Sequence, residues 1–353
     1  MSNLAVVTQF KFKWVDSEGD EEGFLRKKGS FDGQTLRLDS AEIPADAIAS
    51  IETRANRAVI AVLTGEAEPT YLIIAVSGIA VKRLKGLIDV ARSASWAKLE
   101  REELEKKGQG HLYREATCQH CHAVITLSRM AITPQQYCSF CDTLTTISNP
   151  ASAPPAEKNL RLCDECGMFS MPKKFTIFYF YFLVVVYGYR QSTTWRCPGC
   201  MRGEAWKMFF GNLIFILGVP TAIIQLIRSY GGSVAGKFAG LDKANLLARK
   251  GRTPQALAIY RDILKRVPHS AGMNYNIGIS LLETKPDLAV DSLERALDDC
   301  SNYSPAANVL AHCYEKTGQV DKLNELKAIW GEEEPEQTPQ PSTPPQAPPP
   351  LPG

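Results

Sequence analysis

Four CxxC motifs constrain this 353-residue chain more than any other feature of its sequence. They form two pairs: Cys118/Cys121 with Cys138/Cys141, and Cys163/Cys166 with Cys197/Cys200. The first pair is separated by 16 residues, a spacing typical of four-cysteine zinc sites in which each motif presents two thiolates from a tight turn. The second pair is separated by 30 residues and encloses an uncharged hydrophobic run. Because four ligands must meet on one tetrahedron, the chain between Cys166 and Cys197 must leave and return on the same side of any membrane.

Sequential pairing of the motifs is favoured because it closes shorter loops, although the sequence leaves a crossed pairing open. Three rival chemistries compete. The run from Cys118 to His122 has the CxxCH pattern of c-type haem attachment. Haem attachment of this type requires an exported protein, and we expect no signal peptide at Met1–Leu4. Disulfides are disfavoured because a chain without a signal peptide is expected to keep its thiols reduced. A thioredoxin-type redox pair needs a βαβ pattern, which the sequence around the motifs does not show.

Cys300 and Cys313 lie far from any motif and are expected to be buried apolar side chains. We therefore predict two zinc ions as cofactors.

The length predicts several domains, and the net charge of +2 indicates no global attraction to nucleic acid. Residues 1–107 read as a small β domain, with strands expected at Val6–Val15, Gly23–Lys28, Thr35–Leu38, Ala58–Leu63 and Tyr71–Val76 and a helix from Ile79 onward. This order resembles a pleckstrin-homology-like or GRAM-like domain. The resemblance implies lipid head-group binding by strand-edge basic residues, here Lys11, Lys13, Arg26, Lys27 and Lys28, although an ordinary solvated face is the favoured interpretation.

Two segments are predicted to lack a packed core. Residues 148–160 have the composition of a linker, so the zinc ribbons at 112–147 and 161–204 are expected to be separate modules. Residues 331–353 carry nine prolines after an acidic start, which predicts a disordered Pro-rich tail.

The middle of the chain carries the membrane signal. Met208 to Ile227 is 20 residues without a charge, about 30 Å as a helix, so 206–230 is a candidate membrane segment. A break at Gly218-Val219-Pro220 leaves a re-entrant hairpin open as an alternative. Phe175 to Tyr189 is too short to span and is predicted to be the long β-hairpin of the second ribbon, with aromatic residues suited to a membrane interface.

Residues 237–330 show a recurring pattern. Ala244, Gly278 and Ala311 follow one another at 34 and 33 residues, and further small and apolar residues recur in phase. The pattern resembles tetratricopeptide repeats, which implies an α-helical solenoid whose concave surface, from Lys243 to Trp330, binds a protein partner. A plain helical bundle is the alternative.

No catalytic motif is found in the sequence, and we expect no enzyme activity. The predicted fold class is a multidomain α+β chain: β domain, two zinc ribbons, hydrophobic membrane segment, helical repeats and tail. The predicted function is a membrane-associated, zinc-containing scaffold with its ribbons on the cytoplasmic side, where thiols stay reduced. Alternatives are a zinc-ribbon nucleic-acid-binding protein, or less readily a CxxC redox or metal-transfer enzyme.

Overall fold

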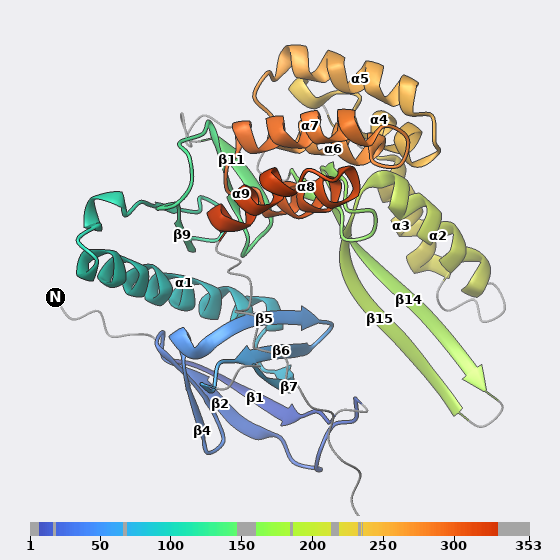
Figure 1. The fold of residues 1–353 in the computed structure, drawn as a ribbon. Helices are drawn as coiled ribbons and strands as arrows, with labels where there is room; N and C mark the ends of the chain where they lie inside the picture. Colours follow the sequence, from blue (N-terminus) through green and yellow to red (C-terminus); the bar gives the residue numbers. More distant parts are fainter. Residues whose placement is uncertain are drawn as a thin grey trace, which may run out of the picture.

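The computed structural model describes residues 7–16, 19–65, 69–146, 160–183, 186–212, 219–231, 234 and 236–330. The fold is mixed α+β, with antiparallel sheets in the first half of the chain and helices in the second (Figure 1). The predicted tail at 331–353 lies outside the described residues, and so does the predicted linker at 148–160 except for Leu160.

Seven antiparallel strands form the N-terminal sheet, in the order β4-β3-β2-β1-β7-β6-β5. They are β1 Thr8–Trp14, β2 Lys27–Phe31, β3 Thr35–Leu38, β4 Ala41–Pro44, β5 Ile48–Arg54, β6 Arg57–Val62 and β7 Thr70–Ser77, with a 3-10 helix at Ala45–Ala47. Helix α1 (Val81–Lys106) follows and packs on β5 and β6. Phe12, Ile60 and Leu84 are fully buried between the sheet and α1. The predicted small β domain with a C-terminal helix is confirmed.

The strands differ from the prediction in two places. β2 begins later than predicted, at Lys27, because the apolar side chains of Phe24 and Leu25 are exposed instead of contributing to the core. β4 and β5 lie in a segment where no strand is predicted, and Ile43 and Ile51 bury their side chains there.

Two further sheets carry the first three CxxC motifs, Cys118/Cys121, Cys138/Cys141 and Cys163/Cys166. After a 3-10 helix at Gly110–Leu112, β8 (Glu115–Thr117) pairs with β9 (Val124–Thr126). A four-stranded sheet has the order β10-β11-β12-β13, with strands at Gln135–Cys138, Thr143–Thr146, Arg161–Leu162 and Phe169–Ser170. β10 and β11 belong to the first motif pair, β12 and β13 to the second, and Thr143 pairs with Arg161. The prediction of two separate modules is therefore wrong, because backbone pairing joins them into one sheet.

The uncharged run at 175–189 lies in a long β-hairpin, as predicted. β14 (Lys173–Leu183) pairs antiparallel with β15 (Val186–Arg196). Figure 1 shows this hairpin extending away from the other sheets, with α2 (Pro198–Asn212) and α3 (Val219–Tyr230) beside its β14 strand.

The predicted membrane segment, Met208 to Ile227, lies in two helices instead of one. α2 ends before residues 213–218 and α3 begins after them, and those six residues lie outside the described part of the chain. Pro220 lies in the first turn of α3, where its missing N–H leaves no helical hydrogen bond unmade. The helices pack on each other and on β14 through a buried cluster of Phe175, Met201, Ala205, Met208 and Ala222. Among the described residues, no helix combines the length and the hydrophobicity needed to cross a membrane.

Residues 241–330 contain six helices, preceded by a 3-10 helix at Gly236–Phe238. They are α4 Leu241–Arg249, α5 Thr253–Arg266, α6 Ala271–Leu281, α7 Pro286–Asp299, α8 Ser304–Thr317 and α9 Val320–Trp330, and each contacts the next. Small residues lie where helices touch: a Cβ on Gly278 would lie 2.6 Å from Cγ of Leu293. The predicted helical region is confirmed.

One face of this helical region is covered by the chain's own β13. Phe169 donates its backbone N–H to Oδ1 of Asn276 (2.8 Å), and its carbonyl accepts from Nδ2 of Asn276 (2.8 Å) and of Asn245 (2.9 Å). The Phe169 ring lies against Gly272, where a Cβ would approach within 2.4 Å of the ring. A partner cannot use this face of α4 and α6 while β13 lies on it.

The first motif pair docks on the same helical region in a similar way. Asn302 accepts from the backbone N–H of Tyr137 (2.9 Å) and donates to its carbonyl (2.8 Å). The rings of Tyr137 and Tyr303 meet edge to face at 5.1 Å. Side-chain amides thus bind the backbone of both β10 and β13, and the ribbons and helices share one hydrophobic core.

We expect Asn276→Ala to destabilise the chain by about 1–3 kcal/mol, because it leaves the buried N–H of Phe169 without an acceptor. Chemical denaturation measures the free energy of unfolding, and hydrogen exchange at Phe169 reports the local effect. The matched control is Asn324→Ala on the exposed surface of α9, which should change stability by less than about 0.5 kcal/mol. Equal effects of the two substitutions would contradict this account.

Candidate metal centres

The structure brings the eight motif cysteines together as two groups of four. One group is Cys118, Cys121, Cys138 and Cys141, and the other is Cys163, Cys166, Cys197 and Cys200. Within each group all sulfur atoms lie within 4.8 Å of one another. This is the sequential pairing, and the two groups could hold two metal ions.

The sulfur separations fit a tetrahedral ion. Sγ of Cys118 lies 3.6 Å from Sγ of Cys141, and Cys121 lies 3.6 Å from Cys138. In the second group Cys166 lies 3.9 Å from Cys197. Four sulfurs at about 2.3 Å from a central zinc would lie about 3.8 Å apart. A disulfide requires about 2.05 Å, and all ten cysteines are free thiols.

Tight turns aim each pair of thiolates at a common point. In three motifs the residue after the second cysteine has a left-handed backbone and donates its N–H to the carbonyl of the first cysteine. These residues are His122 (φ 64°, 2.9 Å), Asp142 (φ 58°, 2.8 Å) and Gly167 (φ 65°, 2.9 Å). The fourth motif runs into α2 instead, where Met201 donates its N–H to the carbonyl of Cys197 at 2.9 Å. The turn reverses the chain within four residues, which is what two ligands from one motif require.

Polar groups outside the motifs contact the sulfurs. Nη1 of Arg249 on α4 lies 3.0 Å from Sγ of Cys200, and Oγ1 of Thr143 lies 3.0 Å from Sγ of Cys141. Burial alone would lower the pKa of Arg249, but the nearby thiolates outweigh it and the pKa is raised. Sequence reasoning missed Arg249 because it lies 49 residues after Cys200 in a helix, and no spacing rule connects them.

The donor sets determine what chemistry the groups support. The sulfurs of each group shift one another's pKa in both directions. Contacts with Cys121 and Cys138 lower the pKa of Cys118, while contacts with Cys118 and Cys121 raise the pKa of Cys138. In the second group, contacts with Cys166 and Cys197 lower the pKa of Cys163, while contacts with Cys163 and Cys166 raise the pKa of Cys200. Metal ligation needs the thiolate form. Four sulfurs complete a tetrahedron and leave no position for water or substrate, so the arrangement is that of a structural centre.

The other residues singled out in the sequence lie apart from the sulfur groups. Lys13 pairs with Glu21 (3.4 Å) and Lys27 with Asp39 (2.7 Å). Lys11, Arg26 and Lys28 line a hollow of about 680 Å³ on the N-terminal sheet. Cys300 and Cys313 are fully buried, as expected, and burial raises the pKa of both thiols.

We expect freshly purified, reduced protein to hold two zinc ions, and Cys118→Ser or Cys197→Ser to hold one each. The cysteines of each group lie in a small buried cluster of their own, so metal binding should supply much of the local folding free energy and each substitution should also unfold its local strands. Mass spectrometry of metal content and hydrogen exchange measure the two effects. Cys313→Ala, outside both groups, serves as the control and should retain two ions. A wild-type content near zero would contradict the assignment.

No known protein family matches this chain. Searches of curated proteins and of solved structures also find no significant match. The function proposed below therefore rests on the chain's own residues.

Proposed function

We propose that this protein is a peripheral membrane-associated adaptor, in which two structural zinc ions help to connect the membrane-facing helices α2 and α3 to a helical region that holds a protein partner. The observation that carries the proposal is an exposed apolar face on α2 and α3, called here the apolar face. It consists of Trp206, Phe210, Ile223, Ile224, Ile227 and Tyr230.

The apolar face is large for a surface open to water. Phe210, Ile224 and Ile227 expose 61%, 56% and 66% of their area. The opposite sides of the same helices are already buried against β14, so the two helices have apolar residues on both sides. Exposed apolar side chains gathered on two neighbouring helices are typical of an interaction surface.

A lipid surface is the occupant that fits the apolar face best. Trp206 and Tyr230 are the aromatic types enriched at the boundary between lipid and water, and the exposed Lys207 and Arg228 flank them. Short amphipathic helices lie in the membrane interface and bury one face to a depth of a few ångströms. This mode of attachment needs no spanning helix, and basic side chains strengthen it on anionic lipid.

The zinc assignment is supported by the all-sulfur donor sets and their tetrahedral separations. Thiolate-bound zinc is stable where thiols stay reduced, which supports cytoplasmic ribbons. The tetratricopeptide-like region, by its six stacked helices, supports a role in holding a protein partner.

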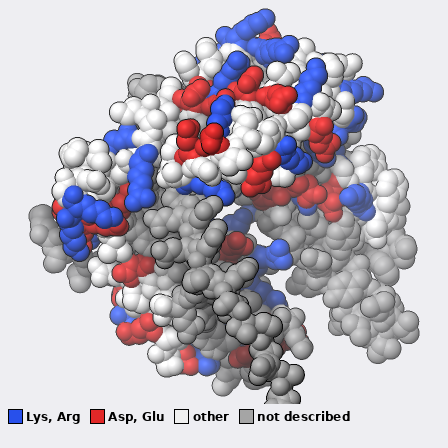
Figure 2. Space-filling model, viewed as in Figure 1, with Lys and Arg blue, Asp and Glu red and all other residues white. Residues whose placement is uncertain are grey.

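Nucleic-acid binding is the alternative function. A nucleic-acid surface usually carries a stripe of Lys and Arg that tracks the phosphates. Figure 2 shows Lys and Arg interspersed with Asp and Glu over the upper part of the molecule, where the helical region lies. This mixed charge favours the adaptor proposal.

We expect Phe210→Asp together with Ile224→Asp to reduce binding to vesicles of phosphatidylcholine and phosphatidylserine at least about tenfold, because two charges would have to enter the apolar layer. Co-sedimentation measures the bound fraction. Both side chains are mostly exposed, so the variant should fold, and an unchanged circular dichroism spectrum and zinc content would verify this.

Phe24→Asp together with Ile132→Asp is the matched control, since it adds the same two charges at side chains that are 95% and 86% exposed and lie before β2 and β10. It should leave vesicle binding unchanged. If the wild-type protein does not bind these vesicles, or if both variants bind as it does, the membrane proposal is wrong.

A further inference from the structure

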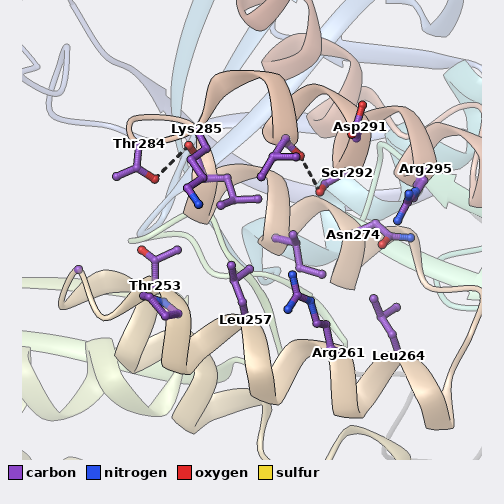
Figure 3. Close-up of a pocket in the computed structure, with 15 residues that line it drawn as sticks. Thr253, Leu257, Arg261, Leu264, Asn274, Thr284, Lys285, Asp291, Ser292 and Arg295 are labelled. Atoms are coloured by element: carbon purple, nitrogen blue, oxygen red, sulfur yellow. Dashed lines mark hydrogen bonds between the residues drawn. The ribbon is translucent and has the colours of Figure 1, made fainter.

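A groove crosses the helical region between α5 and α7, with α6 as its floor. It has a volume of about 570 Å³. Leu257 and Leu264 project into it from α5, as Figure 3 shows, and Ile277, Leu281 and Leu288 add apolar surface from α6 and α7. The size is in the range of cavities that bind small ligands or short peptide segments.

Basic side chains line the rim of this groove. Arg261 on α5 lies across from Arg295 on α7, and Lys285 lies near the other end (Figure 3). Among the described residues, no ion pair is recorded for Arg261, Lys285 or Arg295. Asp291 is the one acidic side chain that lines the groove, so the lining carries a net charge of about +2.

A polar group inside the groove is held in a fixed orientation. Asn274 is 7% exposed and donates Nδ2 to Oδ2 of Asp299 at 2.8 Å. Asp299 in turn contacts Nδ1 of His269 at 3.0 Å. Because the amide is anchored through its nitrogen, its Oδ1 is available to accept a hydrogen bond from a backbone N–H.

The groove lies on the opposite side of α6 from the face that β13 covers. Asn274 and Asn276 are two residues apart, about 200° around the helix axis, so they point to opposite sides. Asn276 binds the backbone of Phe169, while Asn274 faces the groove. The side of the helical region that remains open is therefore this one.

We propose that the groove between α5 and α7 binds an acidic segment of a partner protein, with its aliphatic side chains on the leucine floor and its carboxylates at Arg261, Arg295 and Lys285. The proposal rests on the proposed adaptor function and names the chemistry of its partner. Arg261 and Arg295 pair with no acidic side chain in the described part of the chain, and guanidinium groups favour carboxylates, which they bind in bidentate geometry. The apolar floor favours a peptide over a free phosphate or nucleotide, because a purely ionic ligand would leave the leucines exposed.

The test measures binding in solution, without lipid, so its outcome is independent of the membrane experiment. The probe is a short fluorescein-labelled peptide in which Leu and Glu alternate, and fluorescence anisotropy with the full-length protein reports its Kd. A peptide in which Lys replaces Glu is the charge control. The double variant Arg261→Glu with Arg295→Glu should raise the Kd at least about tenfold. Leu288→Ser, at a side chain 48% exposed, should also weaken binding.

Lys250→Glu with Lys265→Glu is the matched control, because it makes the same change in net charge at two exposed residues outside the groove lining. It should leave the Kd within about twofold of wild type. If both double variants lost affinity for the peptide equally, net charge alone would explain the effect, and the proposal would be wrong. Binding of the Lys peptide as tightly as the Glu peptide would overturn it as well. If a peptide of residues 331–353 displaced the probe more strongly than the unlabelled probe does, the groove would belong to the chain's own tail instead of a partner.

Discussion

The backbone of Phe169, bound by the side-chain amides of Asn276 and Asn245, is the contact on which the arrangement of this molecule depends. Phe169 lies three residues after Cys166, so the second cysteine group and the helical region hold the two ends of one short segment. The same strand, β13, completes the sheet that begins with β10 of the first cysteine group. Without these partners, the buried N–H and C=O of Phe169 would lack hydrogen bonds, which would lower the free energy of unfolding. The contact therefore fixes β13 on the helical region.

The second cysteine group also sets the direction of the projecting hairpin. β15 ends at Arg196, Cys197 follows directly, and α2 begins at Pro198. A metal ion at this group would therefore hold the base of the β-hairpin and the start of α2 at one point, with Arg249 of α4 against Cys200. With a metal bound there, the apolar face of α2 and α3 would have a fixed relation to the helical region. The proposed adaptor function would use such a connection to present a partner at a membrane.

Helix α6 separates a contact within the chain from the proposed peptide groove. On one side Asn276 binds the backbone of Phe169, and on the other Asn274 faces a groove lined by leucines, Arg261 and Arg295. The internal contact shows how an anchored asparagine on this helix reads an extended backbone.

Elements whose signal lies in neighbouring residues could be predicted from the amino-acid sequence. CxxC spacing identified all eight sulfur residues, the aromatic run at 175–189 indicated the hairpin, and the helical period from 237 to 330 indicated the helices. These predictions succeed because tight turns and side-chain periodicity depend on residues close together in the chain.

Features that depend on residues far apart in the chain could be found only in the folded structure. Met208 to Ile227 reads as one apolar segment, yet its helices bury one side against β14 and expose the other, a division that only packing reveals. Arg249 reaches Cys200, and Asn276 reaches Phe169, across 49 and 107 residues, where no sequence spacing signals a contact. The sequence predicted a linker between two separate ribbons, but the structure joins both ribbons in one sheet. This, too, is a contact between residues that are distant in the chain. Pairing between β11 and β12 is set by the common helical surface on which both ribbons dock, and that surface exists only once the chain has folded.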